Sequence, residues 1–106
     1  MQSNKLWQML GLALALPLAA HAAGDPQAGA KKNSMCIGCH GIPGYHTAYP
    51  EVYHVPKLGG QHAEYLVSAL QAYKSGARKH PTMRSIAAQL SDQDMQDLAA
   101  YYSSKQ

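Results

Sequence analysis

The 106-residue sequence has no phenylalanine, one tryptophan and two cysteines. With so few cysteines a disulfide-rich scaffold is excluded. The formal net charge of +3 is too small to indicate a protein that binds the phosphate backbone of nucleic acids. No uncharged apolar run reaches the roughly 20 residues that a membrane-spanning helix needs. We therefore expect a small globular chain that has neither a nucleic-acid partner nor a stable membrane anchor.

The N-terminal residues have the three parts of a cleavable export signal. Lys5 gives a positive start, residues 9–20 are uncharged, and Ala20-His21-Ala22 matches the small-x-small pattern of a cleavage site. The sequence therefore predicts a signal peptide at residues 1–22 and a single domain at residues 23–106. We expect the mature chain in the periplasm, and an uncleaved membrane anchor is the alternative.

Apolar residues recur at helical spacing in the mature chain, and no strand pattern interrupts them. Asp25-Pro26 is typical of a helix start, Gly76 of a helix end, and the segment from Ser91 to Asp94 of a capping box. The pattern predicts an all-α fold of three or four short helices. They are expected over residues 26–41, 61–75 and 85–90 and from Ser91 onward, with a loop between residues 41 and 60.

Small residues in the first expected helix predict a close helix contact. Gly29 and Ala30 would let the last helix approach closely near Ala99 and Tyr102. A domain of this length buries little apolar surface, and such domains usually need a disulfide, a metal or a cofactor to complete the core.

The segment Cys36-Ile37-Gly38-Cys39-His40 matches the motif that attaches a c-type haem. Its two thiols lie one helical turn apart, close enough to bond both vinyl groups of one porphyrin, and the adjacent imidazole then lies beneath the iron. A bare Cys-x-x-Cys would also fit a redox disulfide or half of a zinc site. The histidine and the absence of other cysteines favour one covalently attached haem c, which would also complete the core.

Iron bound by His40 needs a second protein ligand or keeps an open position. Met35 is too close to the attachment turn to reach the opposite haem face, and Met95 lies on the apolar face of the last helix, where core packing is its expected role. Met83 lies in the non-periodic link before that helix, and we expect it to be the second ligand, with His80 as its rival. Thioether ligation raises the reduction potential relative to two histidines. The predicted cofactor-binding residues are Cys36, Cys39, His40 and Met83, of which His40 and Met83 bind the metal.

Further motifs are spaced along the rest of the mature chain: Pro56-Lys57-Leu58-Gly59-Gly60, Tyr65-Leu66, His80-Pro81-Thr82-Met83 and Leu90-Ser91-Asp92-Gln93-Asp94. Together with the haem motif they resemble class I cytochrome c, and more closely the small bacterial cytochromes c-553 and each half of the dihaem cytochrome c-4. The resemblance implies the class I cytochrome c fold around a single haem. It also implies that the Pro56 carbonyl accepts a hydrogen bond from His40 and that Leu58 packs against the porphyrin.

Two protein ligands would leave no site for a substrate on the iron, and the six acidic residues are scattered along the chain. We therefore expect a monomeric one-electron carrier with transient redox partners, and not an enzyme. One alternative is a cytochrome subunit of a larger oxidoreductase, and another is an open-site haem protein that binds a small ligand. Four basic residues are expected either to steer docking or to form an ordinary solvated face: Lys57, Arg78, Lys79 and Arg84.

Overall fold

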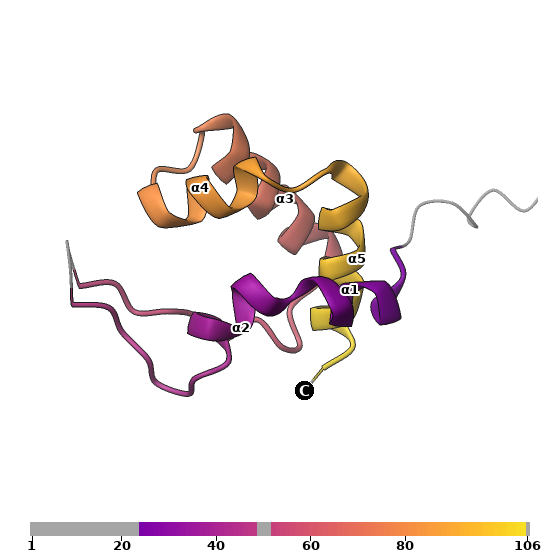
Figure 1. Ribbon diagram of the computed structural model, residues 1–106, viewed down its shortest axis with the longest axis horizontal. Helices are drawn as coiled ribbons and strands as arrows, with labels where there is room; N and C mark the ends of the chain where they lie inside the picture. Colours follow the sequence, from indigo (N-terminus) through magenta and orange to yellow (C-terminus); the bar gives the residue numbers. More distant parts are fainter. Residues whose placement is uncertain (1–23, 49–51, 106) are drawn as a thin grey trace, which may run out of the picture.

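The computed structural model describes residues 24–48 and 52–105, which form five α-helices (Figure 1). Helix α5 packs against α1 and α3, and α3 also packs against α4. Within the described residues the only β-type pairing is an isolated antiparallel bridge, so the all-α prediction is confirmed. The predicted signal peptide, residues 1–22, lies outside the described part. The helices are α1 (Pro26–Lys32), α2 (Ser34–His40), α3 (Ala63–Ser75), α4 (Pro81–Ala88) and α5 (Asp92–Ser103).

The first expected helix is divided into α1 and α2, which raises the number of helices from the three or four expected to five. Asp25 caps α1 as predicted, since its side chain accepts a hydrogen bond from the Gln27 N–H at 3.0 Å. The division falls at Asn33, whose ψ of 6° departs from the helical value near −42°. Asparagine is unfavourable inside helices because its amide competes for backbone hydrogen bonds. As a result, the haem motif lies on a short helix of its own.

Helix α4 begins at Pro81 rather than at Ser85, so the prediction that Met83 lies in a loop was wrong. The side chain of His80 accepts a hydrogen bond from the Met83 N–H and thereby caps the helix. Pro81 occupies the first turn, where its missing N–H leaves no bond unmade. Met83 therefore lies in the first turn of a helix, which fixes its backbone.

Two other predicted helix ends are confirmed. Gly76 ends α3 with a φ of 87°, a left-handed conformation that favours glycine. Ser91 and Asp94 form the expected capping box at the start of α5, with hydrogen bonds of 3.0 and 2.9 Å between each side chain and the other residue's N–H. Among the described residues, no helix is long and apolar enough to cross a membrane.

The close contact predicted between Gly29 and the last helix is present, but its partners on α5 lie one or two positions earlier in the sequence than expected. Gly29 is buried, and a Cβ atom there would lie 2.1 Å from the Asp97 carbonyl oxygen and 2.7 Å from the Tyr101 Cβ. The expected neighbours had been Ala99 and Tyr102. Only glycine lets the backbone of α1 approach α5 this closely.

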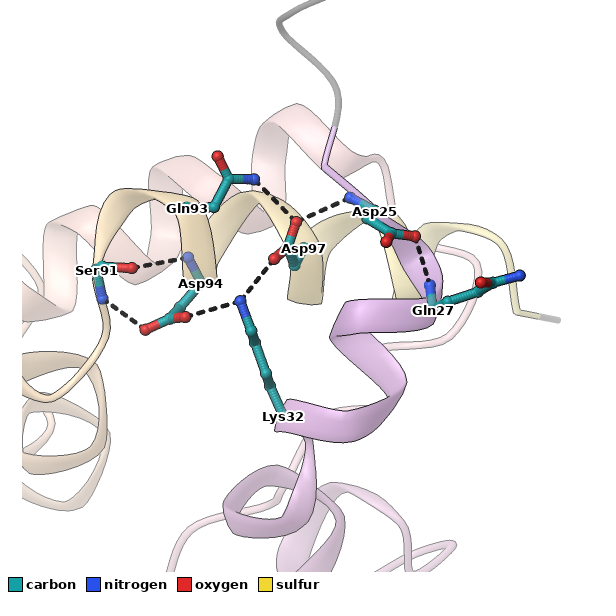
Figure 2. A network of polar contacts seen from close by, with 7 residues as sticks. All are labelled: Asp25, Gln27, Lys32, Ser91, Gln93, Asp94 and Asp97. Carbon is teal, nitrogen blue, oxygen red and sulfur yellow. Dashed lines mark hydrogen bonds and ion pairs between the residues drawn. The ribbon is translucent and has the colours of Figure 1, made fainter.

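A polar network joins the same two helices at their crossing (Figure 2). Asp97 of α5 is 3% exposed and accepts hydrogen bonds from the Asp25 N–H at 2.8 Å, the Lys32 ammonium at 2.6 Å and the Gln93 amide at 2.9 Å. The ammonium also forms an ion pair of 2.9 Å with Asp94. These contacts, led by the one from Lys32, lower the pKa of Asp97 to about 2. Both oxygens of this buried carboxylate thus have hydrogen-bond donors, which the burial of a charge requires.

We predict that ionised Asp97 stabilises the fold and that this stabilisation is lost at acidic pH. Its folded pKa of about 2 lies below the ordinary value of 3.8, so its contribution is complete above pH 4 and is lost as the pH falls toward 2. Asp97→Asn should lower the free energy of unfolding at pH 7 by about 2 kcal/mol, the typical strength of hydrogen bonds to a charged group. It should also flatten the decline between pH 4 and 2, measured by denaturant unfolding of the haem-loaded protein.

Lys32→Met serves as the second variant, because it removes the hydrogen bond that contributes most to the lowered pKa of Asp97 and leaves the Asp97 carboxylate in place. It should move the acid-dependent loss of stability to higher pH. A slope between pH 4 and 2 that is the same in wild type and Asp97→Asn would contradict this role for Asp97.

Candidate functional site

A cavity of about 440 Å³ lies where a domain of this size would have its core. Among the described residues only five hydrophobic side chains are buried: Leu66, Ala87, Met95, Leu98 and Ala99. Met95 is therefore a core residue, as predicted. Further apolar side chains line the cavity, among them Val55, Leu58, Ala69, Leu70 and Ile86. The helices thus enclose an apolar space that this chain does not fill by itself.

All four residues predicted to hold a cofactor line this cavity. Cys36 and Cys39 come from α2, where positions three apart share one face of the helix. His40 ends the same helix, and Met83 comes from the first turn of α4. Burial raises the pKa of the Cys36 thiol. A raised thiol pKa is the opposite of what a redox-active Cys-x-x-Cys needs, since such motifs depend on a stabilised thiolate.

The His40 imidazole is held by the backbone of a segment distant in sequence. Its Nδ1 lies 2.7 Å from the carbonyl oxygen of Pro56. A carbonyl can only accept, so Nδ1 carries the proton and Nε2 keeps its lone pair for a metal. This is the hydrogen bond that the family resemblance implied, and Leu58, two residues further on, lines the cavity as expected.

His80 has a role that the sequence analysis missed. Its Nδ1 accepts the hydrogen bond from the Met83 N–H at 3.2 Å, so this nitrogen is unprotonated. The ring also packs against Tyr53, with 4.0 Å between centroids, and meets the edge of Tyr73 at 6.2 Å. The signal in the sequence was the pair His80-Pro81, a side chain able to cap a helix followed by proline at its first turn.

The loop between α2 and α3 forms one wall of the cavity. Backbone hydrogen bonds join Thr47 to Tyr53 at 2.9 Å and Tyr45 to Val55 at 3.0 Å, which makes the loop a short hairpin. Thr47, Tyr53, His54 and Val55 all line the cavity. The sequence predicted only an irregular loop here, because a pairing this short leaves no alternating pattern to read.

The predicted basic residues lie near the cavity and are exposed. Lys57 and Arg78 line its edge. Arg78 also lies over the ring of Tyr73, 4.7 Å from its centroid. Lys79 and Arg84, with Arg78, surround a second hollow at the turn between α3 and α4. Three of the four basic side chains therefore gather around the N-terminal end of α4.

The residues of the cavity fit a covalently attached haem. The walls are mainly apolar, as a porphyrin requires, and the two thiols lie on one face of a single helix. The imidazole at the end of that helix has an unprotonated Nε2, and a thioether is available from a different helix. Imidazole and thioether are both ordinary ligands of haem iron.

Comparison with known proteins agrees with this fit. The cytochrome c family model matches residues 26–105. The chain is 42% identical over 102 residues to cytochrome c4 of Pseudomonas aeruginosa, covering 96% of this chain and 49% of that protein. It is 45% identical over 87 residues to cytochrome c-554(548) of Halomonas halodenitrificans, covering 79% of this chain and 100% of that protein.

The crystal structure of reduced recombinant cytochrome c4 from Pseudomonas stutzeri has a similar fold, with a TM-score of 0.58 at 28% identity. The match covers 80% of this chain and 52% of that one, so this chain spans about half the length of the cytochrome c4 proteins it matches. The family model covers nearly all the described residues, and the relatives exceed 40% identity. The chain belongs to the cytochrome c family, whose members carry covalently bound haem c.

Proposed function

We propose that this chain is a periplasmic one-electron carrier whose haem c is attached to Cys36 and Cys39 and ligated by His40 and Met83. The observation that carries the proposal is that these four side chains, from two separate helices, line one apolar cavity. The bound haem supplies the couple between ferric and ferrous iron. The chain's own part is to hold two ligands in place and to keep water away from them.

The Pro56 carbonyl sets the orientation of the His40 ring. Its hydrogen bond to Nδ1–H leaves Nε2 as the free lone pair and makes the imidazole a stronger donor, as carbonyl partners of metal-bound histidines do. A ring fixed at both nitrogens moves little when the charge on the metal changes. Small structural change on reduction is what a rapid electron carrier needs.

The start of α4 holds the proposed second ligand. Met83 is fixed through its own N–H by the His80 side chain, and Pro81 restricts the backbone before it. A thioether held by a capped helix costs less entropy to order than one on an open loop. With His40 and Met83 as ligands, the iron would have no position left for a substrate, so we propose a carrier and not an enzyme.

We predict that Met83 is the sixth ligand. In Met83→Ala the sulfur-to-iron charge-transfer band of the oxidised protein should disappear, the reduced protein should bind carbon monoxide, and the reduction potential should fall because thioether ligation favours ferrous iron. Absorption spectra and a redox titration of the exported wild-type and Met83→Ala proteins test this prediction. The intact mass of the exported wild-type protein should equal that of residues 23–106 plus one haem.

Met95→Leu and Met35→Leu are the matched controls. Met95 is fully buried, and leucine conserves its volume, while Met35 is half exposed beside the haem motif. Both variants should keep the charge-transfer band. A wild-type protein without that band, or one that binds carbon monoxide, would favour the open-site alternative. A mass without added haem would remove the proposal as a whole.

We predict that His80 positions Met83 without binding iron. His80→Ala removes the cap, so it should destabilise the fold by about 1 kcal/mol and weaken the charge-transfer band. His80→Asn keeps a side-chain oxygen suited to the same cap and should restore the band. If His80 were the ligand, asparagine would not restore it, and carbon monoxide would bind to both variants.

Transient docking to redox partners is proposed for the surface around the start of α4. The basic side chains gathered there would attract an acidic partner, and such attraction raises the association rate and weakens with salt.

We predict that the second-order rate of electron exchange with an acidic redox protein falls as the ionic strength rises. Arg84→Gln should reduce this slope, and Lys31→Gln, on α1, should leave it unchanged. A rate independent of salt would remove this role.

A further inference from the structure

We propose that His46 and His54 form a two-histidine site for a divalent transition-metal ion of the Zn²⁺ or Cu²⁺ class, on the hairpin between α2 and α3. These histidines take no part in the proposed function, and the site does not depend on it. The inference starts from the backbone of the hairpin, which brings the two rings together although they are eight positions apart in the sequence.

The backbone hydrogen bonds define the register of the pair. The Thr47 N–H donates to the Tyr53 carbonyl, and the Val55 N–H donates to the Tyr45 carbonyl. These bonds bracket His46 and His54, which makes them a directly opposed pair without hydrogen bonds of its own. In such pairs the Cα atoms are about 4.5 Å apart and both side chains project from the same face. The hairpin therefore presents the two imidazoles side by side.

The separation of the rings suits a shared ion. Their centroids lie 5.6 Å apart with the planes tilted by 49°. Two imidazoles that bind one tetrahedral ion through nitrogen–metal bonds of about 2.1 Å have centroids roughly 5 Å apart. The separation of the two rings is therefore compatible with a shared ion.

The surroundings leave the ring nitrogens available. Both histidines are exposed, and within residues 24–48 and 52–105 no hydrogen bond holds either ring. Imidazole nitrogen is a preferred ligand of Zn²⁺, Cu²⁺ and Ni²⁺, and among these Cu²⁺ binds most tightly. No group of three or more histidine, cysteine or acidic side chains in this part of the chain is placed to enclose an ion. Water would complete the coordination, which predicts an exchangeable ion and not a closed structural site.

An ion bound by this pair would join the two paired segments of the hairpin. One of the two ligands, His54, also lines the main cavity, as do Thr47, Tyr53 and Val55 from the same segments. Because the folded hairpin binds the ion and the unfolded chain does not hold the pair in register, binding should stabilise the fold.

Zn²⁺ is the probe of choice, because it does not exchange electrons with haem. We would titrate it into the haem-loaded protein, produced without a polyhistidine tag, and follow binding by calorimetry. The expected result is one ion per chain and a rise in melting temperature that a chelator reverses. His46→Ala and His54→Ala should each weaken binding by at least about tenfold, the lower end of what even outer-shell partners of a metal contribute.

His62→Ala is the matched control, since His62 is also exposed and its side chain does not cap α3. It should bind Zn²⁺ as the wild type does. His46→Ala is the deciding variant, because His46 does not line the cavity and an unchanged haem spectrum will show that the fold is intact. Equal affinity in wild type and His46→Ala would overturn the site. So would one ion per two chains, which would mean that histidines of different molecules share it.

Discussion

An apolar cavity lies where this chain would otherwise have its core, and the rest of the structure depends on how that cavity is filled. Among the described residues, five buried hydrophobic side chains are too few to stabilise a domain of this length, while many more line the cavity. The haem c of the cytochrome c family is the group that fits. We therefore expect folding and cofactor attachment to be coupled, because the apolar side chains that line the cavity would contact the porphyrin and would otherwise be exposed to water.

The first and last helices pack against each other beside this cavity. Helix α1 lies directly on α5, because Gly29 allows the backbones to meet and Asp97 accepts two hydrogen bonds from the α1 side, one from the Asp25 N–H and one from Lys32. That crossing carries no haem ligand, but it fixes the start of α2 and hence the two thiols. This contact between α1 and α5 can therefore hold α2, with the Cys36 and Cys39 thiols, in place although the domain has few buried apolar side chains.

Much of this arrangement could be predicted from the sequence, because the deciding signals are local. The haem motif is five consecutive residues, and the cap at Asp25 and the capping box at Ser91 also depend on near neighbours. Both caps are where they were expected. The break at Asn33 and the early start of α4 could not be read from apolar spacing, since each depends on one polar residue. The hairpin wall was missed because its pairing joins residues that are six to ten positions apart in the sequence. Contacts between distant segments, such as that of His80 with Tyr53, leave no periodic trace.

The hydrogen bonds of His40 and His80 show which of the two rings has a nitrogen free to bind iron. His40 donates from Nδ1 to a carbonyl, so its Nε2 has a free lone pair. His80 accepts at Nδ1 from a backbone N–H, so in the neutral ring the proton is on Nε2 and no nitrogen is free for iron. To bind the metal, His80 would have to give up the cap of α4, and the N–H of Met83 would lose its partner. The same hydrogen bond therefore disfavours His80 as a ligand and holds Met83, in the first turn of α4, at the cavity wall.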